Sequence, residues 1–126
     1  IAQISAYNSG DASTVSWLIT PQIDLDAQEF EFFDFESSNS FSDGSELELL
    51  ISTDWDGTDA SVSSATWTSL PGTIVPDATY YKDWIYSGLV DLSPYSGNAH
   101  IAFKYTANSG NTGTYEIDNV KVLVQN

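Results

Sequence analysis

The chain of 126 residues contains no cysteine and no methionine, and its only histidine is His100. Without cysteine the fold cannot contain a disulfide, a cysteine-ligated zinc site or a thiol nucleophile. His100 has no serine or cysteine partner motif around it, so the sequence predicts no catalytic triad. Thiol chemistry is therefore excluded, and we expect no catalytic role for His100.

Positive charge is also scarce. The sequence has no arginine and three lysines against 18 acidic residues, which gives a formal net charge of -15. Such a charge repels phosphate backbones, so nucleic acid is not an expected partner. Solubility and the binding of divalent cations remain as uses for this acidity. We expect most of the acidic side chains to form a solvated surface.

Long apolar runs are absent from the sequence. None approaches the roughly 20 residues of a membrane-spanning helix, so membrane insertion is not expected. The sequence starts at Ile1 and shows no signal-peptide pattern. We interpret residues 1–126 as a single module excised from a longer protein, with neighbouring domains linked covalently to it.

Residue patterns typical of β-strands dominate the sequence. Leu47, Leu49 and Ile51 alternate with more polar neighbours, as do apolar residues around Phe103, and this period of two is typical of strands with one buried face. No stretch has convincing helical periodicity. Strands are predicted at residues 15–20, 28–36, 46–53, 84–91, 99–106 and 114–124. Short strands joined by polar loops predict an all-β fold, an antiparallel β-sandwich of the jelly-roll type.

In two of these predicted strands the alternation of apolar and polar residues is interrupted. In residues 30–35 the apolar positions shift phase by one residue, which indicates either a β-bulge or burial on both faces. In residues 115–122 the apolar set also shifts, and the polar pair Asp118 and Asn119 lies at the break. This polar pair favours a bulge in the last strand.

Six segments of the chain together resemble a known family. They are "WLITPQIDL", "LELLISTDWDG", "ATWTSL", "WIYSGLVDLSPYSG", "HIAFKYTANSG" and "YEIDNVKV". In this order and at these spacings they resemble the choice-of-anchor J domain, also called the cleaved-adhesin type, which is related to the MAM jelly rolls. The similarity extends from about Trp17 to Val122.

The resemblance implies a jelly-roll sandwich on a secreted or surface-anchored bacterial protein, often from Bacteroidetes. Members of the family are accessory modules beside adhesin, peptidase, nuclease or polysaccharide-degrading domains. In related jelly rolls calcium is commonly held near the acid of a C-terminal "IDN" strand, and Asp118 is the matching position here.

A structural Ca²⁺ is therefore expected near Asp118. Further oxygen ligands could come from Asp34 and Glu36, which lie two residues apart on one strand, and from Asp11 and Asp43 in loops. Such an ion would relieve repulsion in an acidic chain and stabilise the fold by mass action. The alternative for Asp118 is a carboxylate that bonds the backbone of the bulge.

The stretch STDWDGTD, residues 52–59, has three aspartates around a tryptophan and a glycine. Asp54 and Asp56 are spaced as in calcium loops, and the glycine permits a sharp turn. The closing glutamate of an EF-hand is missing, since position 65 is Ala65. The alternatives are a bound cation and an exposed turn in which aspartates cap their own backbone.

Aromatic residues offer candidate ligand contacts. Trp17 and Trp67 fall inside strand patterns and are expected in the core. The other candidates lie near polar groups, where large rings suit the apolar faces and hydroxyl edges of sugars. The predicted ligand-binding residues are Trp55, Tyr80, Tyr81 and Trp84, with Asp54 and Asp56 accepting hydroxyl groups.

These features favour a non-catalytic carbohydrate-binding module of a secreted multidomain protein. A neutral polysaccharide is the expected partner, because the negative charge disfavours anionic glycans. The alternative is an adhesion or protein-interaction module without sugar binding. Enzymatic activity is not expected: among 18 acidic residues some pair will have the spacing of glycosidase carboxylates by chance, but a 126-residue sandwich without a deep cleft is a poor scaffold for catalysis.

Overall fold

The computed structural model of the chain describes residues 2–5, 13–27, 31–40, 45–76, 82–108 and 113–124. Its strands are β1 (Ala2–Ile4), β2 (Ser13–Ile19), β3 (Ile23–Asp24), β4 (Glu31–Ser40), β5 (Glu46–Ser52), β6 (Thr68–Ser69), β7 (Ile85–Tyr86), β8 (Val90–Asp91), β9 (Asn98–Asn108) and β10 (Thr114–Val124). The helix found in these residues is a 3-10 turn, η1 (Asp59–Ser64). Within the same residues no helix has the length and apolar character needed to cross a bilayer.

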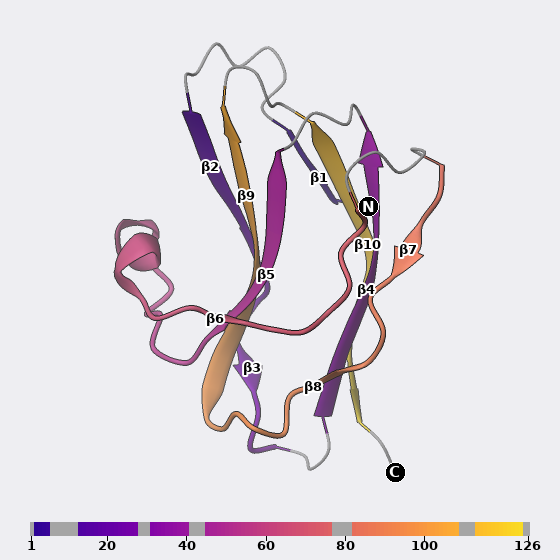
Figure 1. The fold of residues 1–126 in the computed structure, drawn as a ribbon. Helices are drawn as coiled ribbons and strands as arrows, with labels where there is room; N and C mark the ends of the chain where they lie inside the picture. The colour runs from indigo at the N-terminus through magenta and orange to yellow at the C-terminus, as the bar shows by residue number, and fades with distance from the viewer. Residues whose placement is uncertain are drawn as a thin grey trace.

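The strands form two antiparallel sheets that lie face to face (Figure 1). The first, here called the β4 sheet, has the order β1-β10-β4-β7, with β8 also paired to β4. The second, the β9 sheet, has the order β2-β9-β5-β6, with β3 also paired to β9. The prediction of an all-β antiparallel sandwich is therefore confirmed.

The core lies between the long central strands of the two sheets. Phe33 and Phe35 of β4 are fully buried, and Phe103 of β9 is 2% exposed. The rings of Phe35 and Phe103 meet edge to face, with centroids 4.8 Å apart at 82°, an arrangement that the ring quadrupoles favour. The alternation read from the sequence at Leu49 and Phe103 thus identified the inner face correctly.

The predicted strand at residues 84–91 is wrong as a single element. The chain instead forms two short strands, β7 and β8, that pair with different parts of β4. Between them Gly88 has a φ of 77°, a left-handed conformation that interrupts the strand. Ser87 maintains the pairing there, because its Oγ accepts a hydrogen bond of 2.9 Å from the backbone N–H of Phe35.

The two breaks in strand period have different causes. The pairing of β10 with β4 shifts register between Asp118 and Lys121, and Asn119 has a φ of 53°. This confirms the bulge predicted in the last strand. In β4, by contrast, the break reflects burial on both faces, since Phe35 faces the core while Asp34 on the opposite face is only 3% exposed.

Candidate functional site

The loop from residue 53 to residue 67, here called the β5–β6 loop, contains η1 and all of the STDWDGTD stretch except Ser52, which is the last residue of β5. Ser52 starts it: its Oγ accepts hydrogen bonds of 3.2 Å from the backbone N–H groups of both Asp54 and Trp55. The same hydroxyl donates to Asp54 Oδ1 at 2.8 Å. Asp54 Oδ1 also accepts a 2.8 Å bond from the N–H of Thr66, so this carboxylate joins the two ends of the loop.

Asp56 organises the tip of the loop in the same way. Its Oδ1 accepts hydrogen bonds from the Ser61 hydroxyl and from both the N–H and the hydroxyl of Thr58. These bonds, led by that from Ser61, lower the pKa of Asp56 from 3.8 to about 2. Gly57, with a φ of 88°, allows the turn. Asp54 and Asp56 are exposed, as expected, and their bonds support the interpretation of the stretch as a self-capped turn.

Three indole rings lie in a row between the β9 sheet and this loop. The centroids of Trp17 and Trp67 are 5.1 Å apart, and those of Trp67 and Trp55 are 6.2 Å apart. Trp55 also meets the His100 ring edge to face at 4.6 Å. We call Trp17, Trp67 and Trp55 the tryptophan row.

The loop orients two of these rings. Trp55 Nε1 donates to the carbonyl of Thr58 at 3.0 Å, and Trp67 Nε1 donates to the carbonyl of Val62 at 2.8 Å. Both polar N–H groups are thereby satisfied inside the protein. The ring surfaces that remain open are apolar, which is the part of an indole that stacks on other flat groups.

The prediction that Trp17 and Trp67 belong to the core is wrong. Both are half-buried on the outer face of the β9 sheet, while Leu18 next to Trp17 packs against the core. The outer face also carries Leu50 and Ala102, a cross-strand pair that is almost fully buried. A small second apolar cluster therefore lies outside the sandwich, beneath the β5–β6 loop.

An open groove of about 660 Å³ lies beside this cluster. We call it the tryptophan groove; its lining residues are Val15, Trp17, Glu48, Leu50, Ser63, Ala65, Trp67, Ser69 and Lys104. Glu48 and Lys104 are directly paired across β5 and β9, and Lys104 Nζ lies 5.3 Å from the centre of the Trp17 ring. Trp17 also borders a smaller hollow of about 360 Å³ with Asp59. The groove thus combines two indoles, hydroxyl groups and one residue of each charge.

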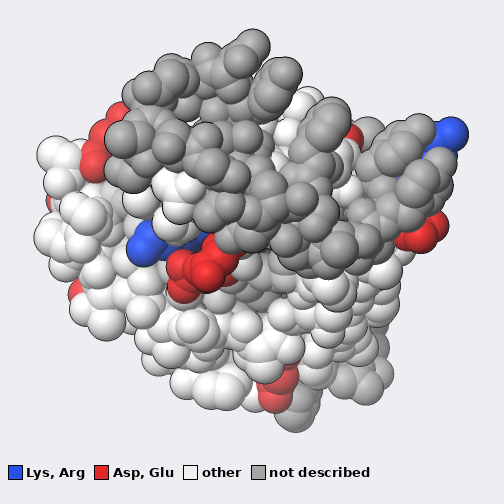
Figure 2. All heavy atoms as spheres, turned by 45° about the horizontal axis from the view of Figure 1, so that its top comes forward, with Lys and Arg blue, Asp and Glu red and all other residues white. Residues whose placement is uncertain are grey.

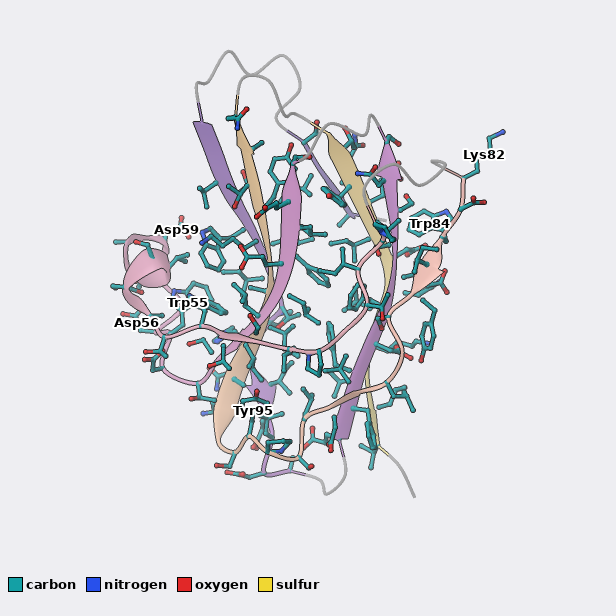
Figure 3. All side chains as sticks on the ribbon, in the orientation of Figure 1. Trp55, Asp56, Asp59, Lys82, Trp84 and Tyr95 are labelled. Carbon is teal, nitrogen blue, oxygen red and sulfur yellow. The ribbon has the colours of Figure 1, made fainter. Side chains whose placement is uncertain are left out.

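The predicted aromatic site is only partly assembled. Trp55 and Asp56 lie together on the β5–β6 loop, as Figure 3 shows, but Trp84 lies on the opposite side of the sandwich beside β7. Trp84 and Trp55 therefore cannot contact one ligand ring together. Tyr80 and Tyr81 fall outside the described residues.

The predicted calcium ligands are also only partly brought together. Asp118 lies directly opposite Glu36 across β10 and β4, and Asn119 Nδ2 donates to Glu36 Oε1 at 3.2 Å. Asp34 Oδ2 instead accepts a 2.7 Å bond from the Tyr86 hydroxyl. Among the described residues no group of three or more potential metal ligands is found. Asp11 and Asp43 lie outside those residues, and calcium binding stays a prediction.

Sequence reasoning missed the residues that line the groove. Glu48 and Lys104 had ordinary positions in alternating strands, and only the pairing of β5 with β9 makes them neighbours. The sequence did contain information on these residues. Trp17, Glu48 and Lys104 each lie directly beside a core-facing residue in the same strand. Strand alternation alone assigns such residues to the outer face.

His100 gives the site a predicted pH response. Burial lowers the pKa of its imidazole below the ordinary value of 6.5. The folded state therefore favours neutral His100, so its contribution to the free energy of unfolding is complete above pH 6.5 and is lost as the pH falls through the folded-state pKa. Replacing His100 with glutamine should flatten this part of the stability profile. As the only histidine, it can be titrated directly by NMR, and a midpoint at or above 6.5 would contradict the prediction.

On the face seen in Figure 2, the acidic side chains of the described residues are not gathered at one place. These side chains form several separate groups there. This pattern agrees with the expectation of a solvated acidic surface.

No family model matches the chain, and no curated protein matches it in sequence.

Proposed function

We propose that this domain is a non-catalytic carbohydrate-binding module of a secreted or cell-surface bacterial protein. Its ligand is a neutral polysaccharide, bound in the tryptophan groove. The observation that carries the proposal is the pair of indoles, Trp17 and Trp67, bordering an open groove that also contains Glu48 and Lys104.

The chemistry of the groove suits a sugar ring. Indole faces stack on the C–H faces of pyranose rings, because both surfaces are flat and apolar. The Glu48 carboxylate accepts hydrogen bonds from hydroxyl groups, the Lys104 ammonium donates them, and the Ser63 and Ser69 hydroxyls do both. The groove therefore offers both donors and acceptors to the hydroxyl groups of a ligand.

Two features favour a neutral ligand and a binding role rather than catalysis. The net charge of -15 repels anionic glycans such as uronates and sulfated polymers. Among the described residues, Glu48 is the one carboxylate that lines the tryptophan groove, whereas glycoside hydrolysis commonly uses two. A module of this kind would hold a neighbouring domain of a longer protein on its substrate.

The proposal is tested with a panel of immobilised neutral and anionic polysaccharides. We expect at least one neutral polymer to retain the domain and the anionic polymers not to retain it, at physiological salt. The retained domain should elute with soluble oligosaccharide of the same polymer and not with salt alone. If no polymer retains it, the proposal is wrong, and the alternative of a protein-interaction module is favoured.

A further inference from the structure

The smaller hollow beside Trp17 adjoins the tryptophan groove. Its volume is about 360 Å³, against about 660 Å³ for the groove, and both lie in the roughly 300–1,000 Å³ range of small-ligand sites. The residues that line the hollow are Trp17, Ile19, Asp59, Val62 and Ser63. Trp17 and Ser63 also line the groove, so the two spaces share a boundary. We call the smaller one the η1 hollow, because Asp59, Val62 and Ser63 belong to η1.

The groove and the η1 hollow lie on opposite sides of Trp17 along β2. Alternate residues of a strand project to one face; on this face the groove contains Val15 and the hollow contains Ile19. Four residue steps of a strand span roughly 13 Å, which is longer than a single sugar ring. One ring therefore does not reach from Val15 to Ile19, whereas a chain of linked rings does.

The β5–β6 loop fixes the spacing between the two spaces. Trp67 lines the groove, and its Nε1 donates a 2.8 Å hydrogen bond to the carbonyl of Val62, which lines the hollow. Within η1 the carbonyl of Ser61 accepts a 3.0 Å bond from the N–H of Ala65. Walls that are held in place before binding reduce the entropy cost of binding. Two such spaces at a fixed distance favour a ligand whose units repeat at that distance.

The η1 hollow has its own polar groups for a sugar. Asp59 is exposed and lies on η1, outside the β9 sheet (Figure 3). Its carboxylate can accept hydrogen bonds from the hydroxyl groups of a sugar ring in the hollow, and the Ser63 hydroxyl can donate or accept. Ile19 and Val62 supply apolar surface for the C–H face of the same ring.

We propose that the ligand is a linear chain of at least two linked neutral sugar units that occupies both spaces. One unit lies in the tryptophan groove beside Trp67, and another lies in the η1 hollow, where Asp59 accepts its hydroxyl groups. The linkage between them passes Trp17 and Ser63, the residues that the two spaces share. This inference rests on the proposed function and adds the substrate class, a linear polymer recognised over several units rather than a single sugar.

Isothermal titration with sugars of increasing length tests the proposal. The probes are linear oligosaccharides of one to six units from α-1,4-glucan, β-1,3-glucan, β-1,4-glucan, β-1,4-mannan and β-1,4-xylan. In a series that binds, the affinity should rise by about tenfold or more between one and four units, since contacts in both spaces are then joined in one molecule. It should change little with further length.

Asp59→Ala tests whether the chain reaches the η1 hollow, because Asp59 lines the hollow and not the groove. One hydrogen bond to a charged group corresponds to about tenfold in affinity, so the variant should lose most of the gain between one and four units. Asp83→Ala is the matched control. Asp83 is also an exposed aspartate but lies beside β7 of the other sheet, and its variant should keep the full gain.

A single sugar that binds as tightly as its four-unit chain overturns this inference and leaves the proposed function standing. The inference is also wrong if Asp59→Ala keeps the whole gain, or if no linear series binds although a polysaccharide retains the domain. If no polysaccharide retains the domain, the proposed function fails as well. Melting curves establish that both variants are folded, and the length series on the unaltered chain decides the question if Asp59→Ala is not.

Discussion

Phe35→Ala is expected to lower the free energy of unfolding by about 3–5 kcal/mol, the usual cost of removing a large buried ring. Phe35 is fully buried, and its ring lies 4.8 Å from that of Phe103 and 5.8 Å from that of Phe33. Truncation would therefore leave a cavity between the two sheets and remove two ring contacts. Urea denaturation measures the loss, and because a domain has only about 5–15 kcal/mol in total, the milder Phe35→Leu should be measured beside it.

Phe32→Ala is the control for this prediction. Phe32 lies three positions before Phe35 on the same strand, but on the outer face of the β4 sheet, where it is only half-buried. Its truncation should cost clearly less, since water can reach the space that the ring leaves. Equal losses in the two variants would mean that the core does not lie where the fold places it.

Trp67→Ala is expected to weaken binding to a retained polysaccharide by about 2 kcal/mol or more, as for a ring at a binding hot spot, which is roughly thirtyfold in affinity. Trp67 lines the tryptophan groove, and its ring centroid lies 5.1 Å from that of Trp17. Its truncation therefore removes one of the two indoles of the groove and the ring contact that supports the other. Isothermal titration with a soluble oligosaccharide measures the effect.

Trp84→Ala provides the matched comparison, because Trp84 is also a half-buried tryptophan but lies beside the other sheet. It should bind the ligand like the parent. Trp67 lines the groove together with the buried Leu50, so each titration needs a melting curve to establish that the variant is folded at the temperature used. If Trp67→Ala is folded and binds normally, the tryptophan groove is not the binding site.

The fold could be read from the sequence wherever one strand face is buried. The alternation of apolar residues around Leu49 and Phe103 assigned both to the inner face, and the polar pair at Asp118 located the bulge. The break at residues 84–91 was missed because it depends on two short strands pairing at separate places on β4. Such pairing depends on residues far apart in the sequence, so the local alternation of apolar and polar residues does not predict it.

The candidate site was harder to predict for a related reason. Trp17 and Trp67 were expected inside because large aromatic residues in strands usually are, but the β5–β6 loop provides a second apolar surface outside the sheet. The pairing that makes Glu48 and Lys104 neighbours joins residues far apart in sequence. Single-residue patterns can assign a face to each of them, but only the register of β5 against β9 makes them one site.

The hydrogen bond between Asp54 and Thr66 also bears on how such a domain can diversify. It closes the β5–β6 loop at its base, so residues 55–65 form a unit whose internal bonds depend little on the sandwich. Changing the length of a loop that is already closed costs little entropy, about 0.6 kcal/mol for each doubling. Substitutions and insertions there can therefore reshape the wall of the groove while the scaffold remains unchanged, which makes this segment a natural position for a sequence library in binder engineering.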